Sequence, residues 1–242
     1  MSDYEFNYSQ YTKKLNIKNN NFSIIFLVII LLLGCCVYLK PLDLKNNKLY
    51  FIQAQEFQTY NDAKNLSQEI KKNGFAGYIY FDKNYHVLIS FHTSKADAKT
   101  TLKNSKSKHK NISIFYLEKK GFFNGKNLNK TQIKAITNFK NKTEKISLEL
   151  ENYYSSFFDN SLDLKTLSIH IENIKNNFDK THTKLIKSFD NNSKFNPAKK
   201  HANNMLKSLS NLCLNVNELT PSSAQYEIIN FVINQYQFLS CF

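Results

Sequence analysis

The chain has 242 residues and a formal net charge of +14 at pH 7. All 33 basic residues that carry this charge are lysines. Because nucleic-acid-binding proteins use arginine for paired contacts to phosphate and guanine, the lack of arginine argues against that class. By segment the charge is +2 for residues 1–40, +5 for 41–118 and +7 for 119–242, so no segment stands out as a basic patch.

The N-terminal region predicts a tail followed by a membrane anchor. Residues 1–21 are polar and have no apolar periodicity, as is typical of a disordered tail. Residues 22–39 contain no charged side chain. As a helix this segment would reach about 27 Å, close to the ~30 Å of a bilayer's hydrocarbon core. We therefore expect one transmembrane helix.

A second mode of anchoring stays open. The stretch Leu32-Leu33-Gly34-Cys35 is similar to a lipoprotein cleavage site, at which Cys35 would be lipidated and the preceding residues removed. The apolar run continues past Cys35, and this continuation favours the uncleaved helix. Lysines flank the anchor on both sides, so charge alone gives little information about its orientation.

After a short linker at 40–48, residues 49–118 change period repeatedly. The order of elements is βαββαβ, which predicts a four-stranded antiparallel sheet with both helices on one face, an α+β ferredoxin-like module. Gly74 is expected to end the first helix, and Ser94 to begin the second. The strands are expected at 49–54, 76–81, 85–90 and 111–117, and the first helix at 61–73.

Residues 129–242 are predicted to be entirely helical, after a hinge at 119–128. Apolar residues alternate in steps of three and four, which is typical of helices packed in an antiparallel bundle. A turn and helix start are expected at Asn160-Ser161, and Asn196-Pro197 and Thr220-Pro221 open two further helices. Part of the apolar stripe is alternatively available to a partner chain.

The middle block resembles the SPOR domain, a bacterial module that binds peptidoglycan glycan strands stripped of their stem peptides. The family's first strand is matched by the run from Tyr50 to Phe57, and its helix by Ala63, Leu66 and Gly74-Phe75. The run from Tyr85 to Ser90 matches the third strand, and Ala98 the second helix. This resemblance covers about 30 per cent of the chain. It implies peptidoglycan as a partner and a place at the division or sporulation septum. It also implies an N-terminus in the cytoplasm, with residues 40–242 outside it.

Strand alternation gives candidate sugar-binding residues on the sheet face opposite the helices. Three positions depart from the family pattern: Gln55 and Ser90 stand where glycines are usual, and His86 where arginine is usual. Aromatic rings suit the flat faces of sugars, and amide or imidazole groups suit their hydroxyls. The expected open face carries Phe51, Gln53, Tyr78, Tyr80, His86 and Leu88.

No catalytic or cofactor motif is apparent. The six histidines show no metal-binding spacing, and His182 falls on an apolar stripe where a hydrogen-bonded core histidine is expected. Cys213 and Cys241 are expected on a helical hairpin, too far apart for a disulfide, as buried thiols. We therefore expect a protein that is not an enzyme and needs no cofactor or metal.

The sequence predicts a single-pass envelope protein that localises by binding glycan. The alternative is a membrane-anchored scaffold whose SPOR-like sheet has lost glycan binding and contacts another protein, a view favoured by the loss of both glycines. In either case the helical half is available to a protein partner.

Overall fold

The computed structural model describes residues 48–105, 111–118, 128–190, 192–214, 218 and 220–242. The predicted tail, the anchor with Cys35, and nearly all of the linker and hinge lie outside these residues. None of the helices in the described ranges is both long and apolar enough to cross a membrane. All described residues belong to one compact unit, 46–242.

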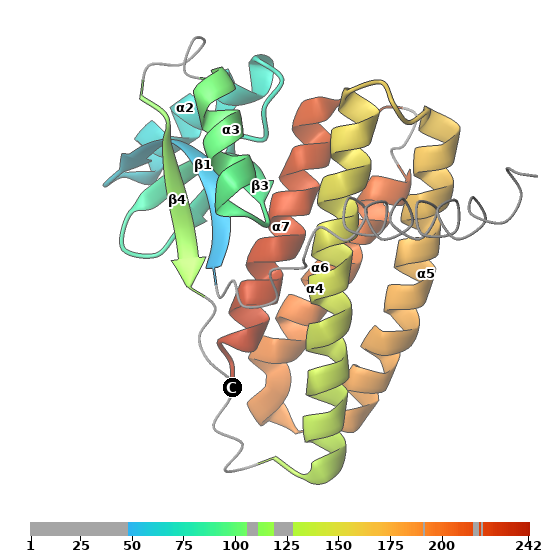
Figure 1. The fold of residues 1–242 in the computed structure, drawn as a ribbon. Coiled ribbons are helices and arrows are strands. Elements are labelled where there is room, and N and C mark those ends of the chain that lie inside the picture. The colour runs from blue at the N-terminus through green and yellow to red at the C-terminus, as the bar shows by residue number, and fades with distance from the viewer. Residues whose placement is uncertain (1–47, 106–110, 119–127, 191, 215–217, 219) are drawn as a thin grey trace, which may run out of the picture. The chain divides into compact units, whose positions relative to one another are not determined.

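The first half of the described chain is a four-stranded antiparallel sheet, as predicted (Figure 1). The strand order is β2-β3-β1-β4, and the element order is βαββαβ. Observed bounds lie within a few residues of the expected ones. The elements are β1 (Lys48–Phe57), α2 (Tyr60–Lys72), β2 (Tyr78–Phe81), β3 (Tyr85–His92), α3 (Lys95–Ser105) and β4 (Ser113–Glu118).

Helices α2 and α3 cover the aliphatic face of the sheet, again as predicted. Thr59 caps α2 by accepting the N–H of Asp62 at 3.3 Å, and Ser94 caps α3 by accepting that of Asp97 at 3.0 Å. Between the helices and the sheet lies a small buried cluster, which comprises Tyr50, Ile52, Ala54, Ala63, Ile70, Val87, Ile89, Ala98 and Ile112.

Two glycines shape the turn between α2 and β2. Gly74 has a φ of +85°, in the left-handed region that follows a helix end. Gly77 has a φ of +54°, and a Cβ there would lie 2.5 Å from the carbonyl oxygen of Ser67. The Ser67 hydroxyl also donates to the carbonyl of Gly77 at 2.5 Å. This close approach requires glycine at 77, because any side chain would push β2 away from α2.

The second half is a bundle of four long helices (Figure 1). Asn129 forms a capping box with Gln132, and Thr220 forms one with Ser223. The expected helix start at Asn160-Ser161 is wrong: Asn160 has a φ of 57° just after the preceding helix, and Asp163 is the cap. The elements are α4 (Lys130–Phe158), α5 (Leu164–Ser188), the 3-10 turn η2 (Ser193–Phe195), α6 (Asn196–Leu214) and α7 (Pro221–Leu239).

The sheet and the bundle share one hydrophobic core. The face of the sheet that α2 and α3 leave free contributes Phe51, Leu88 and Phe91 to a cluster that also contains Phe139 and Phe231 of the bundle. Helix α7 contacts both β2 and β3. The helical half is therefore packed on the sheet rather than separated from it.

Candidate functional site on the sheet

The six predicted sugar-binding residues do share one face of the sheet. In the β2–β3 pair, Tyr78 lies opposite Leu88 and Tyr80 lies opposite His86. In the β1–β3 pair, Gln53 lies opposite Leu88. Since directly opposed residues of an antiparallel pair point to the same side, the strands bring these side chains together as the alternation predicts.

This face is buried, however, and the expectation that it is open was wrong. Phe51 and Leu88 have no exposed surface, and His86, Tyr80 and Gln53 are only 5%, 7% and 8% exposed. A sugar ring needs direct access to an aromatic face or to a polar side chain. In this arrangement none of these five side chains offers that access. The physical reason is non-local: helix α7, from the other end of the chain, covers the strands.

Helix α7 is held on the sheet by polar as well as apolar contacts. The Tyr78 hydroxyl donates to Oδ1 of Asn230 at 3.2 Å, and its ring lies 5.1 Å from that of Tyr226. At the start of α7, the Ser222 hydroxyl donates to the carbonyl oxygen of Phe75 at 2.6 Å. These contacts fix the position of α7 along β2.

A polar group lies at the hairpin end of the same face. Nδ1 of His86 is 2.9 Å from Oε1 of Gln53, and Nε2 is 3.1 Å from Oδ1 of Asp82. The Phe115 ring stacks on the imidazole at 4.5 Å between centroids. Each ring nitrogen of His86 therefore already has a partner within the sheet, and the stacked ring covers the imidazole from the side.

The Asp82 carboxyl is held in its charged form. Partial burial acts to raise its pKa, but hydrogen bonds from the backbone N–H groups of Lys83 and Asn84 and from His86 outweigh burial and lower the pKa below its usual value. The pKa values of Tyr78 and Tyr80, the two tyrosines on this face of the sheet, are raised instead. Burial raises the pKa of Tyr80 to about 12 and raises that of Tyr78 further, so both remain neutral donors at physiological pH.

A second polar network links the sheet to α4. Glu151 accepts hydrogen bonds from the backbone N–H of Thr93 at 3.0 Å and from its hydroxyl at 2.5 Å. The other carboxylate oxygen lies 3.3 Å from Nδ1 of His92, whose Nε2 is 3.0 Å from the Ser90 hydroxyl. Ser90, at a position where the resembled family has glycine, therefore belongs to a chain of contacts that ends on the bundle.

Two accessible aromatic rings that share a neighbour lie elsewhere, Phe81 at the tip of the β2–β3 hairpin and Tyr60 at the start of α2. Phe81 is 55% exposed and Tyr60 is 51% exposed. Tyr85 lies between them, with ring centroids 4.6 Å from Phe81 and 5.8 Å from Tyr60. We call these three residues the aromatic tip. Alternation in β2 marks Phe81 as facing away from Tyr80, but only the fold brings Tyr60 beside Tyr85.

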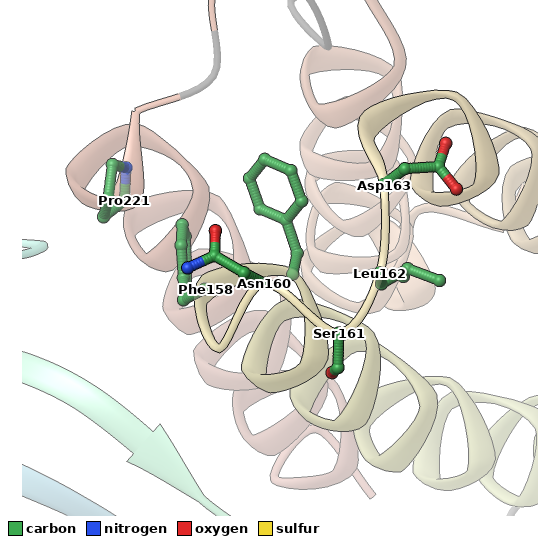
Figure 2. A pocket seen from close by; sticks show the side chains of 7 residues that line it. Phe158, Asn160, Ser161, Leu162, Asp163 and Pro221 are labelled. Carbon is green, nitrogen blue, oxygen red and sulfur yellow. The ribbon is translucent and has the colours of Figure 1, made fainter.

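An open hollow of about 710 Å³ lies at the α4–α5 turn, beside the start of α7 (Figure 2). Asp163 is its only acidic residue, and its carboxylate accepts from the Thr166 N–H at 2.9 Å and the Thr166 hydroxyl at 2.6 Å. Figure 2 shows Asp163 on the far side of the turn from Pro221. This hollow holds no nucleophile with an adjacent base, and no group of metal-ligating residues occurs among the described residues.

The remaining candidate side chains have structural surroundings. His182 is a hydrogen-bonded core residue, as predicted, with Nε2 2.8 Å from Oδ1 of Asn203. Cys213 and Cys241 are free thiols. The expectation that both are buried was wrong: Cys213 is only partly buried, and Cys241 is exposed in the last turn, where it donates to the Gln237 carbonyl at 3.3 Å.

Comparisons with known proteins found no family model, no curated protein and no solved structure that matches this chain.

Proposed function

We propose that this protein is a non-catalytic scaffold of a bacterial cell envelope, tethered at the membrane by residues 22–39. Its SPOR-like sheet packs against its own helical bundle instead of a glycan strand. The observation that carries this proposal is the burial of Phe51, Gln53, Tyr80, His86 and Leu88, the side chains on which sugar binding would depend.

Two of the three departures from the family pattern, Ser90 and His86, support this reading. A glycine at position 90 has no side chain, whereas Ser90 contacts His92, which in turn contacts Glu151 of α4. The side chains of His86 and Gln53 are hydrogen-bonded to each other instead of facing solvent. Since buried polar groups are stable only when they are hydrogen-bonded, these substitutions fit a covered face better than an open one.

The aromatic tip is the surface that we assign to a protein partner. Exposed aromatic residues in contact with one another are enriched in protein interfaces, where large rigid rings bury much area with little loss of entropy. Tyr60 and Phe81 are exposed, and both contact the partly buried ring of Tyr85. The scaffold would hold this partner near the membrane.

A second candidate function is glycan binding by a form in which the bundle has moved off the sheet. The polar contacts between the two halves favour this candidate, because interfaces between folded parts that are rich in polar contacts resemble transient interfaces. They include the contacts of Tyr78 with Asn230, Ser222 with Phe75, and Thr93 with Glu151.

Binding to amidase-treated sacculi separates the two candidates. The full chain, a known SPOR protein as positive control, and the variants Glu151→Ala and Tyr78→Phe would be sedimented with sacculi. The scaffold proposal expects neither the full chain nor the variants to bind. Binding by the variants alone would support the masked-glycan function, and binding by the unaltered chain would overturn the scaffold proposal.

The partner surface is tested by a photoreactive amino acid at Phe81 in cells. Position 116 is a matched control, because Tyr116 is a 48% exposed aromatic residue at the other edge of the sheet. We expect a discrete crosslinked protein from position 81 only. Equal crosslinking from both positions would contradict an assignment to the aromatic tip.

A further inference from the structure

The four-helix bundle separates its charges along its length. The helices alternate in direction, so the start of α4, the end of α5 and the start of α6 lie at one end (Figure 1). The half of the bundle at this end, residues 128–143, 176–190, 192–204 and 231–242, contains ten lysines and two acidic residues. The opposite half, over the rest of the described bundle, contains four lysines and eight acidic residues.

The lysines in the terminal turns at the lysine-rich end of the bundle are accessible to a charged surface. Six are exposed, and no ion pair within 4.0 Å is found for any of them among the described residues. Lys199, beside them, donates to the carbonyl oxygen of Asp190 at 2.5 Å. A shallow hollow between α4 and α5 continues the same surface and includes Lys142. We call the six exposed lysines the basic end: Lys130, Lys134, Lys184, Lys187, Lys194 and Lys200.

We infer that the basic end is a docking surface for anionic lipid headgroups, which orients the bundle against the membrane that anchors the chain. Clustered lysines attract an anionic bilayer over about one Debye length, and each lysine near such a surface increases partitioning about fivefold. Because the acidic half faces the other way, the bundle has one preferred orientation on such a surface. The absence of arginine favours this occupant over a nucleic acid.

The position of the predicted anchor is compatible with this contact. Lys48, the first described residue, pairs with Glu118 at the end of β4, and in Figure 1 β4 points toward the end at which α4 begins. Along α4, the start of the helix lies about 32 Å from Glu151, which binds the end of the neighbouring strand β3. The segment from Leu39 to Lys48 reaches about 30 Å when extended. This length is about the same as that separation, so the predicted anchor and the basic end can meet one membrane surface only with this segment nearly fully extended.

Amine footprinting of the full chain tests this inference. The protein would be reconstituted in nanodiscs of phosphatidylcholine, or of phosphatidylcholine with phosphatidylglycerol, and the acylation rate of each lysine measured by mass spectrometry. We expect the lysines of the basic end to react about fivefold or more slowly on anionic discs only, and to recover in 0.5 M salt. Lys165 and Lys207 in the opposite half should react equally on both discs.

A matched pair of charge reversals completes the test. Replacing Lys184, Lys187, Lys194 and Lys200 by Glu should abolish the protection of Lys130 and Lys134 on anionic discs. Replacing Lys145, Lys165, Lys175 and Lys207, the four lysines of the opposite half, by Glu should leave that protection unchanged. Equal rates on both kinds of disc would overturn the inference. So would protection by soluble polyphosphate or DNA with none on anionic discs, which would assign the surface to a soluble polyanion.

Discussion

The two faces of the sheet are closed in different ways. One is covered by α2 and α3, which lie next to the strands in sequence and pack small aliphatic residues. The other is covered by α7, which begins about 130 residues after the end of β3, and this face carries aromatic and polar side chains. The alternation of side chains along the strands produces both faces. The difference between the faces lies in which helices pack on each one. A face that would be open in an isolated module is here part of a shared core.

The largest expected effect on stability follows from truncating a side chain in the core that the sheet and the bundle share. Phe51 is fully buried and its ring lies 5.5 Å from that of Phe91 and 6.2 Å from that of Phe115. Phe51→Ala should lower the free energy of unfolding by about 3–5 kcal/mol. Because the cluster spans both halves, denaturant unfolding followed by circular dichroism should shift as one transition.

The matched change on the other face is Ile52→Val, which should lower the free energy of unfolding by about 0.5–1.5 kcal/mol. A Phe51→Ala protein in which the helical bundle unfolds at an unchanged denaturant concentration would contradict the shared core.

A medium effect is expected from the polar link between the sheet and α4. Glu151→Ala removes the acceptor for both the N–H and the hydroxyl of Thr93, and leaving these donors unpaired costs about 1–3 kcal/mol. Hydrogen exchange at Thr93 should become faster. Glu149→Ala, which removes a 3.6 Å pair with exposed Lys145, should change stability by less than about 0.5 kcal/mol. Unchanged exchange at Thr93 would show that Glu151 does not hold the two halves together.

The smallest effect concerns pH at the hairpin end of the covered face. The pKa of Asp82 is lowered in the folded protein, so its contribution to stability is fully present above the unfolded value of about 4 and is lost as the pH falls through the folded value. The unaltered protein should lose unfolding free energy as the pH falls below about 4. Asp82→Asn should make this loss smaller, by under ~1 kcal/mol because the carboxylate is partly exposed. Urea titrations at pH 3 to 7 measure this, with Asp179→Asn on the exposed surface of α5 as the control.

Much of the local structure was predictable from short-range signals. Apolar alternation and turn residues placed all four strands, and Thr220-Pro221 placed the start of α7 to the residue. The α4–α5 turn was placed correctly at Asn160-Ser161, but the cap of α5 was misplaced because Asn160 and Ser161 are as suited to a cap as Asp163. The requirement for glycine at 77 could not be predicted, because it arises from the carbonyl of Ser67 on another element.

The sequence by itself determined the elements, their order, and which side chains share each face of the sheet, because these depend on periods of two and 3.6 residues. Only the tertiary structure decided that the face with Gln53 and His86 is covered, since this depends on where α7 packs. It also decided where the lysines gather. In the chain they lie in separate stretches, at the start of α4, the end of α5 and the start of α6, and the alternating directions of the helices bring these stretches to one end of the bundle.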